Sequence, residues 1–268
     1  MRFSPVLDGK NQRENQPRIV AVSRLWNGAR LQASILVRSR PRPHLISFSD
    51  CITQFYLFCV FEGLECLLLT VMCYDRYVAI CKPLHYNVTM NFQFCCIMVI
   101  TCWVLIALLA LIPTITIPQL KFCGSNTVNH FFCDLDPILQ LSCSDTTIII
   151  LEVTLLNFVF VFIPFCTIIV SYVYIIITIF KIPSISSRQR VFSTCSSHLI
   201  VVSIFYGTMV CVYLLPQSGP PRNTKILALM YTVVTPLLNP IIYSLRNKDF
   251  KIAVDKMINH CLHWLFSK

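Results

Sequence analysis

FCCIMVITCWVLIALLALIPTITI, residues 94–117, is an apolar run without a single Asp, Glu, Lys or Arg. A helix rises 1.5 Å per residue and the hydrocarbon core of a bilayer is about 30 Å thick, so a run of this length can cross a membrane. Inside lipid only a helix or a closed barrel satisfies its backbone hydrogen bonds, and this run is continuous rather than alternating. The stretch therefore predicts a transmembrane α-helix.

Four more stretches pass the same test of length and apolarity. They cover approximately residues 52–74, 148–180, 191–215 and 226–245. Composition agrees, because 56% of the 268 residues are hydrophobic and 13% are charged, whereas soluble domains carry about 25% charged residues. We therefore predict an all-α transmembrane helix bundle with five spanning helices, its core occupying residues 45–245.

The two ends of the chain differ from this core. Residues 1–44 hold nine Lys or Arg against two acidic residues, and they show neither a helical nor a strand period. We expect this basic segment to be disordered. Residues 246–268 place apolar side chains three and four apart among lysines, which predicts an amphipathic helix on the cytoplasmic membrane surface.

Basic residues in the connections orient the bundle, because loops rich in Lys and Arg stay in the cytoplasm. By this rule 75–93, 181–190 and 246–268 are cytoplasmic, whereas 118–147 and 216–225 are external. Five crossings then put the N-terminus outside. The basic residues before the first helix favour the opposite side.

Several classes of function are disfavoured. The sequence has no cysteine pair with zinc-site spacing, no glycine-rich phosphate loop, and no nucleophile beside a base and an orienting acid. We therefore expect no enzyme activity, no cofactor and no bound metal. Nucleic acid is not an expected partner, because the positive charge is concentrated in residues 1–44. A channel or transporter is disfavoured by the lack of inverted repeats.

A series of motifs resembles the odorant-receptor branch of the rhodopsin-like G-protein-coupled receptors. They are CYDRYVAIC at 73–81 with KPLHY at 82–86, FSTCSSHL at 192–199, FYGT at 205–208 and PLLNPIIYSLRNK at 236–248. The resemblance runs almost without a break from residue 45 to residue 268. It implies a rhodopsin-like seven-helix architecture, here reduced to five spanning helices plus the C-terminal surface helix, because the first apolar helix resembles the family's third.

The resemblance implies a function and a set of switch residues. A small-molecule odorant would bind among the helices at the plasma membrane, and the inner face would activate a stimulatory heterotrimeric G protein. Arg76 would be held by Asp75 at rest and released on activation. The implied switch residues are Asp75, Arg76, Tyr77, Tyr172, Asn239, Pro240 and Tyr243. Residues 82–86 and 188–190 would form the rim of a groove for a G-protein helix.

The odorant pocket implied by the resemblance is apolar with few polar anchors. Its residues would be Phe58, Cys59, Glu62, Gly63, Asn157, Phe160, Tyr206, Met209 and Tyr213. Ordinary helix packing is an equal alternative for each of them. Glu62 suggests a preference for amine or hydroxyl odorants.

Glu65 matches a position of a sodium-binding pocket in the family, together with Asn239. The aspartate that completes that pocket on the family's second helix has no counterpart here. Insertion of a charged carboxylate into a membrane helix costs about 2.5–3.5 kcal/mol. We therefore expect Glu65 to be protonated and free of metal.

Four cysteines lie at or beyond the outer ends of the predicted helices: Cys51, Cys123, Cys133 and Cys143. Four half-cystines allow three pairings, so their spacing does not select one. The resemblance pairs Cys51 with Cys133 and Cys123 with Cys143. The cysteines inside the apolar runs are expected to act as small hydrophobic residues.

The resemblance stops at residue 44, and the family's first two helices have no match in the sequence. This predicts a receptor that inserts poorly, is retained in the endoplasmic reticulum and signals weakly. In the alternative reading, the chain does not signal but associates with full-length receptors and retains them.

Overall fold

The computed structural model describes residues 47–123 and 132–213. All regular elements within these ranges are helical, apart from one isolated antiparallel bridge between Phe122 and Ser142. The predicted all-α class is confirmed. The described residues include four helical segments long and apolar enough to cross a membrane, Phe48–Cys81, Phe92–Gln119, Thr147–Phe180 and Ile185–Val210. The predicted helices 226–245 and 246–268 and the basic segment 1–44 lie outside the described residues.

The chain divides into two compact units. One consists of residues 35–191, and the other combines residues 1–34 with 192–268. The boundary falls inside α9 (Ile185–Tyr213), the last described helix. The unit 35–191 contains the other described helices.

Helix α2 (Phe48–Cys81) forms the core of the unit 35–191. Its first turn is capped by Ser47, whose Oγ accepts a hydrogen bond from the Asp50 amide at 3.1 Å. The helix ends before Pro83, because the proline disfavours helical geometry at Lys82, whose φ and ψ are −134° and 54°. The predicted end at residue 74 was wrong. Charged side chains mark where an apolar run stops, but they do not break a helix.

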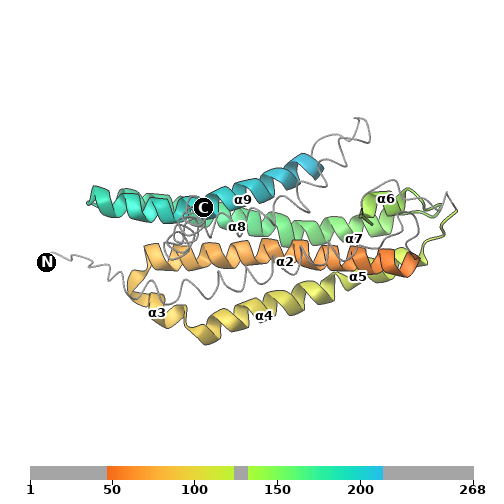
Figure 1. Ribbon diagram of the computed structural model, residues 1–268, viewed down its shortest axis with the longest axis horizontal. Helices are drawn as coiled ribbons and strands as arrows, with labels where there is room; N and C mark the ends of the chain where they lie inside the picture. The colour runs from red at the N-terminus through yellow and green to blue at the C-terminus, as the bar shows by residue number, and fades with distance from the viewer. Residues whose placement is uncertain (1–46, 124–131, 214–268) are drawn as a thin grey trace, which may run out of the picture. The chain divides into compact units, whose positions relative to one another are not determined.

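Two interrupted helices flank α2 (Figure 1). On one side, α4 (Phe92–Leu109) leads into α5 (Leu111–Thr116) and the 3₁₀ turn η2 (Ile117–Gln119). On the other, α7 (Thr147–Asn157) leads through the π-helical turn η3 (Phe158–Phe162) into α8 (Ile163–Phe180).

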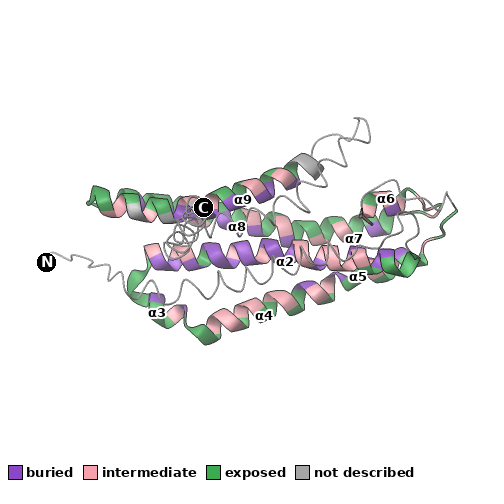
Figure 2. Ribbon diagram, viewed as in Figure 1, coloured by how far each residue is buried: buried purple, intermediate pink, exposed green. Residues whose placement is uncertain are grey.

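Burial follows from this arrangement (Figure 2). Within the most apolar stretch of α2, 56% is buried inside the molecule. The corresponding values are 11% for Phe92–Gln119 and 17% for Thr147–Phe180. The outer faces of the flanking helices are exposed and apolar, which suits contact with lipid.

Prolines account for the two interruptions, which the prediction of continuous helices over 94–117 and 148–180 missed. Pro113 has no amide hydrogen to donate to the carbonyl of Leu109, and α4 ends at Leu109. Pro164 follows the π turn, in which the Ile163 amide bonds the Phe158 carbonyl five residues back. Hydropathy does not register either break, because proline leaves the apolar character of a segment intact.

Short helical turns join these segments. After α2 come η1 (Pro83–His85) and α3 (Tyr86–Thr89), and α6 (Leu135–Leu139) lies in the connection before α7. Where α2 begins, a compact apolar core joins it to this connection. Its buried members are Cys51, Ile52, Phe55, Ile117, Cys133, Ile138 and Ile149.

Candidate functional site

The predicted switch residues Asp75 and Arg76 lie near the end of α2 but inside it. Asp75 is only 6% exposed. One carboxylate oxygen, Oδ2, lies 3.8 Å from Nε of Arg76. The other, Oδ1, accepts a hydrogen bond from the Tyr86 hydroxyl at 2.8 Å. The buried carboxylate therefore has two partners, and the tyrosine makes the shorter contact.

Tyr86 was predicted only as part of the groove rim, so its bond to Asp75 was missed. Its side chain is buried, and it begins α3 after the chain turns at Pro83. Burial, and then the charge and the hydrogen bond of Asp75, raise the pKa of Tyr86 above its ordinary value of 10. The phenol therefore keeps its proton at physiological pH and remains a donor. The proline after α2 is the signal that could have pointed to a chain reversal here.

Tyr77 has different neighbours. Its ring meets the Tyr174 ring of α8 edge to face, with 6.3 Å between centroids and 73° between planes. Nζ of Lys82 lies 6.0 Å from the centre of the Tyr77 ring. The same two helices are linked where Cys81 Sγ and Thr178 Oγ1 lie 3.3 Å apart. Tyr77 thus belongs to the contact between α2 and α8.

The other predicted switch residues are only partly described. Tyr172 is buried on α8. Asn239, Pro240 and Tyr243 lie outside the described residues, so a cluster of tyrosines around Arg76 stays a prediction. In the predicted rim, the Arg188 guanidinium donates a hydrogen bond to the Ile182 carbonyl at 2.9 Å.

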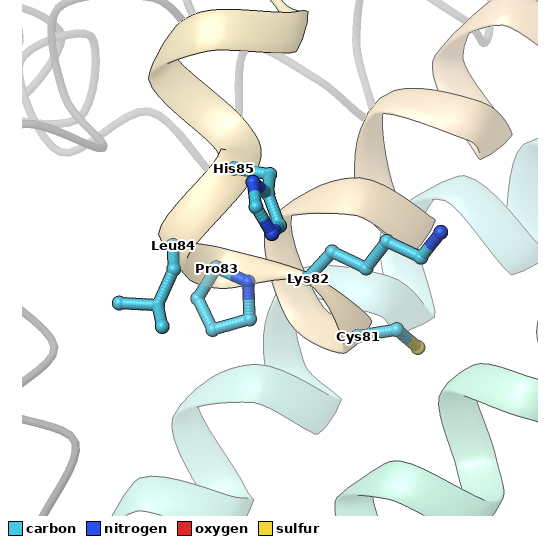
Figure 3. A pocket seen from close by; sticks show the side chains of 5 residues that line it. All are labelled: Cys81, Lys82, Pro83, Leu84 and His85. Atoms are coloured by element: carbon cyan, nitrogen blue, oxygen red, sulfur yellow. The ribbon is translucent and has the colours of Figure 1, made fainter.

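The turn after α2 carries an open hollow of about 390 Å³, lined by Cys81, Lys82, Pro83, Leu84 and His85 (Figure 3). Apolar side chains are exposed around this turn. Leu84 is 92% exposed, Val88 76% and Phe92 57%. Lys82 and Leu84 both line the hollow, and their side chains extend in different directions from the turn (Figure 3).

The predicted odorant-pocket residues fall in both units. Phe58, Cys59, Glu62 and Gly63 follow one another along α2, whereas Asn157 ends α7 and Phe160 lies in the π turn. Tyr206, Met209 and Tyr213 are on α9, in the other unit. Tyr206 and Met209 are three residues apart and so share a helical face.

Gly63 lies against α4. A Cβ atom placed on it would come within 2.6 Å of Ile106 Cγ1. Two turns earlier on α2, the Tyr56 hydroxyl donates a hydrogen bond to the Ala107 carbonyl at 3.2 Å. These contacts favour helix packing as the role of Gly63, the alternative that the sequence left open.

Glu65 is buried on α2. Over residues 47–123 and 132–213, no three His, Cys, Asp or Glu side chains gather as they would around a metal ion. Asn239, the other residue of the resemblance's sodium pocket, is outside those ranges. The protonated, metal-free state of Glu65 therefore stays a prediction.

Both cysteine pairs expected from the resemblance are bonded. Cys51 joins Cys133, with Cα atoms 5.4 Å apart, and Cys123 joins Cys143, with Cα atoms 5.9 Å apart. The first bond ties the start of α2 to the connection before α7, and the second closes a loop within that connection.

The connection ends at Asp145, whose carboxylate accepts hydrogen bonds from the hydroxyl and the amide of Thr147. These bonds lower the pKa of Asp145, so the group is charged at neutral pH. They also satisfy an amide in the first turn of α7.

Comparison with known proteins gives consistent results. Residues 42–261 match the family model described as Olfactory receptor. The chain is 50% identical over 215 residues to Olfactory receptor 10A7 of Homo sapiens. The aligned residues make up 80% of this chain and 68% of that receptor. It is 46% identical over 223 residues to Olfactory receptor 1468 of Rattus norvegicus, covering 81% and 71%.

A solved structure of squid rhodopsin matches with a TM-score of 0.59 and 20% sequence identity. The match covers 79% of this chain and 61% of the rhodopsin chain. At this identity the match shows the fold alone, a rhodopsin-like helix bundle.

Proposed function

The chain belongs to the olfactory receptor family, and on that premise we propose that it binds a small volatile ligand and activates a stimulatory heterotrimeric G protein. Membership makes it a multi-pass membrane protein of the G-protein-coupled receptor type, not an enzyme. The observation that carries the proposal is the Asp75 carboxylate, buried near the end of α2 and shared between Arg76 and Tyr86.

Because Tyr86 also bonds the Asp75 carboxylate, release of Arg76 costs less free energy than it would if Arg76 were the sole partner. Removing the partner of a buried charged group normally leaves it unsatisfied, at a cost of several kcal/mol. Here Asp75 keeps the hydrogen bond from Tyr86 when Arg76 moves away. A ligand that binds the released arrangement more tightly than the resting one shifts the population toward it.

The surface around the turn after α2 supports a protein partner at the same end. Leu84, Val88 and Phe92 expose apolar side chains there, and Lys82 adds positive charge. An amphipathic helix of a partner binds such a combination by placing its apolar face on the apolar side chains. We assign this role to a helix of the G protein α subunit.

Within the unit 35–191, the ligand would lie among the pocket residues predicted on α2 and around the π turn. Phe58 and Phe160 supply apolar surface, and Glu62 supplies a carboxylate that favours a protonated amine or a hydroxyl group. Most small-molecule pockets combine an apolar lining with a few polar anchors in this way.

The test is the cyclic AMP level in cells that express the chain, exposed to volatile amines and alcohols. We expect at least one compound to raise cyclic AMP. Leu84→Asp should abolish the response at unchanged surface staining, because it puts a charge on the apolar contact, whereas Leu84→Met should preserve it.

A chain at the plasma membrane that answers no volatile compound would contradict the proposed ligand class. A chain confined to the endoplasmic reticulum would contradict the plasma-membrane location and match the retention expected from the sequence. Co-precipitation with an intact receptor, without any response, would then favour the receptor-retaining alternative.

A further inference from the structure

The turn Phe132–Asp134, called here the anchored turn, is attached to α2 at three points. Cys133 is disulfide-bonded to Cys51. The Cys133 amide donates a hydrogen bond to Oε1 of Gln54 at 3.1 Å. The Phe132 ring lies 5.2 Å from the Phe58 ring, tilted by 43°.

The three attachment points on α2 form one stripe. Cys51, Gln54 and Phe58 are spaced by three and four residues, so they lie on the same face of the helix. Phe58 is the farthest from the start of α2 and belongs to the predicted odorant pocket. The stripe therefore runs from the disulfide to the pocket.

Gln54 holds the backbone of the anchored turn. Cys133 is 3% exposed within the apolar core at the start of α2, and a buried amide needs an acceptor. The side-chain oxygen of Gln54 fills that need. The disulfide fixes the distance of Cys133 from α2 but leaves the orientation of its backbone free, and the hydrogen bond restricts that orientation.

The orientation of the Cys133 backbone sets where the preceding side chain lies. With the amide on Gln54, Phe132 packs on Phe58. Phe132 then extends the apolar surface of Phe58 toward the start of α2. A ligand beside Phe58 would meet this ring as the limit of the pocket in that direction.

We propose that Gln54 is a positioning residue for the odorant site: by holding the Cys133 amide it seats Phe132 on Phe58, and Phe132 limits the length of the apolar tail that the site accepts. This inference rests on the proposed function. It adds two residues, Gln54 and Phe132, to those predicted from the sequence.

The first experiment needs no ligand. Phe132→Cys places a thiol on the anchored turn, and its reaction rate with a membrane-impermeant maleimide reports how often the turn leaves α2. Adding Gln54→Leu removes the acceptor and should raise the rate roughly three- to tenfold, the factor that one net hydrogen bond supports. Gln54→Glu keeps an acceptor oxygen and should stay slow, and Thr53→Val is the matched neighbour control. An unchanged rate with Gln54→Leu would overturn the proposal.

The second experiment measures cyclic AMP responses to straight-chain alcohols from butanol to decanol. Gln54→Leu and Phe132→Ala should each move the most potent alcohol to a longer chain, and combining them should add no further shift. An equal loss of potency for all the alcohols would mean that Gln54 serves stability alone, and would overturn the proposal. If the unaltered chain answers none of them, the alcohol response of the proposed function fails, while the labelling rates still decide whether Gln54 seats the turn.

Discussion

At the scale of single residues, the Asp75 carboxylate links a charged partner to a neutral one. Arg76 is adjacent in sequence and lies 3.8 Å away, whereas Tyr86 comes from the following turn and donates at 2.8 Å. Hydrogen bonds to charged groups contribute about 1.5–3 kcal/mol, more than neutral pairs. The tyrosine is therefore the group that keeps Asp75 satisfied when the arginine leaves.

Tyr86→Phe should weaken activation. Without the hydroxyl, Asp75 depends on Arg76 alone, so release of the arginine costs more, and the concentration of ligand needed for half-maximal cyclic AMP should rise about tenfold. Tyr56→Phe is the matched control. It also removes a tyrosine hydroxyl, but that hydroxyl bonds the Ala107 carbonyl of α4 and not Asp75. Higher activity of Tyr86→Phe in the absence of ligand would count against this role.

The sequence predicts part of this site well. The adjacent charges at 75 and 76 by themselves favour a simple interfacial pair at a helix end. Together with Tyr77 and the motifs that follow, they predict a switch. The contact with Tyr86 was not predictable in the same way, because it depends on the path of the chain after Pro83. For the disulfides, cysteine spacing left three pairings open. The resemblance selected one of them, and the fold brings Cys51 beside Cys133.

At the scale of helices, the packing of α2 against α4 depends on the absence of a side chain at Gly63. The neighbouring Ile106 occupies the place that a Cβ atom would take, and it is the buried residue of α4. Close packing of this kind tolerates added volume poorly, at about 1–3 kcal/mol for an inserted group.

Gly63→Ala should lower the thermal stability of the detergent-solubilised chain, although alanine has the higher helix propensity by about 1 kcal/mol. Adding Ile106→Val should recover part of the loss, because it removes a methyl group from the contact. Gly207→Ala on α9 is the control, since a Cβ there meets no atom within 4 Å. Equal stability of the Gly63 and Gly207 variants would contradict close packing at Gly63.

Helix existence was predictable from hydropathy, but helix ends and interruptions were not. The described spans overlap the predicted apolar runs, because apolar side chains are the ones that lipid accommodates. Helix α9 begins at Ile185, six residues before its predicted run. The end of α2 at Cys81 and the break at Leu109 depend on backbone donors that Pro83 and Pro113 lack. Pro113 lies inside an apolar run and Pro83 lies beyond the end of one, so a scan for prolines in and just after the runs would have located both.

At the scale of the whole molecule, family membership and local geometry support one another. The family match over residues 42–261 agrees with the extent of the resemblance read from the sequence motifs. The unit 35–191 then supplies what the motifs alone could not, namely the second partner of Asp75 and the attachment of Phe132 to α2. The pocket residues on α9 and the motif at 236–248 remain predictions from the sequence.

The most direct test of the account is the rate of GDP–GTP exchange on a purified stimulatory G protein, added to membranes that contain the chain, with and without an activating volatile compound. The account predicts that the compound accelerates exchange for the unaltered chain, and that Arg76→Gln reduces the rate to that seen without the compound. Exchange that the compound still accelerates fully with Arg76→Gln would contradict the account.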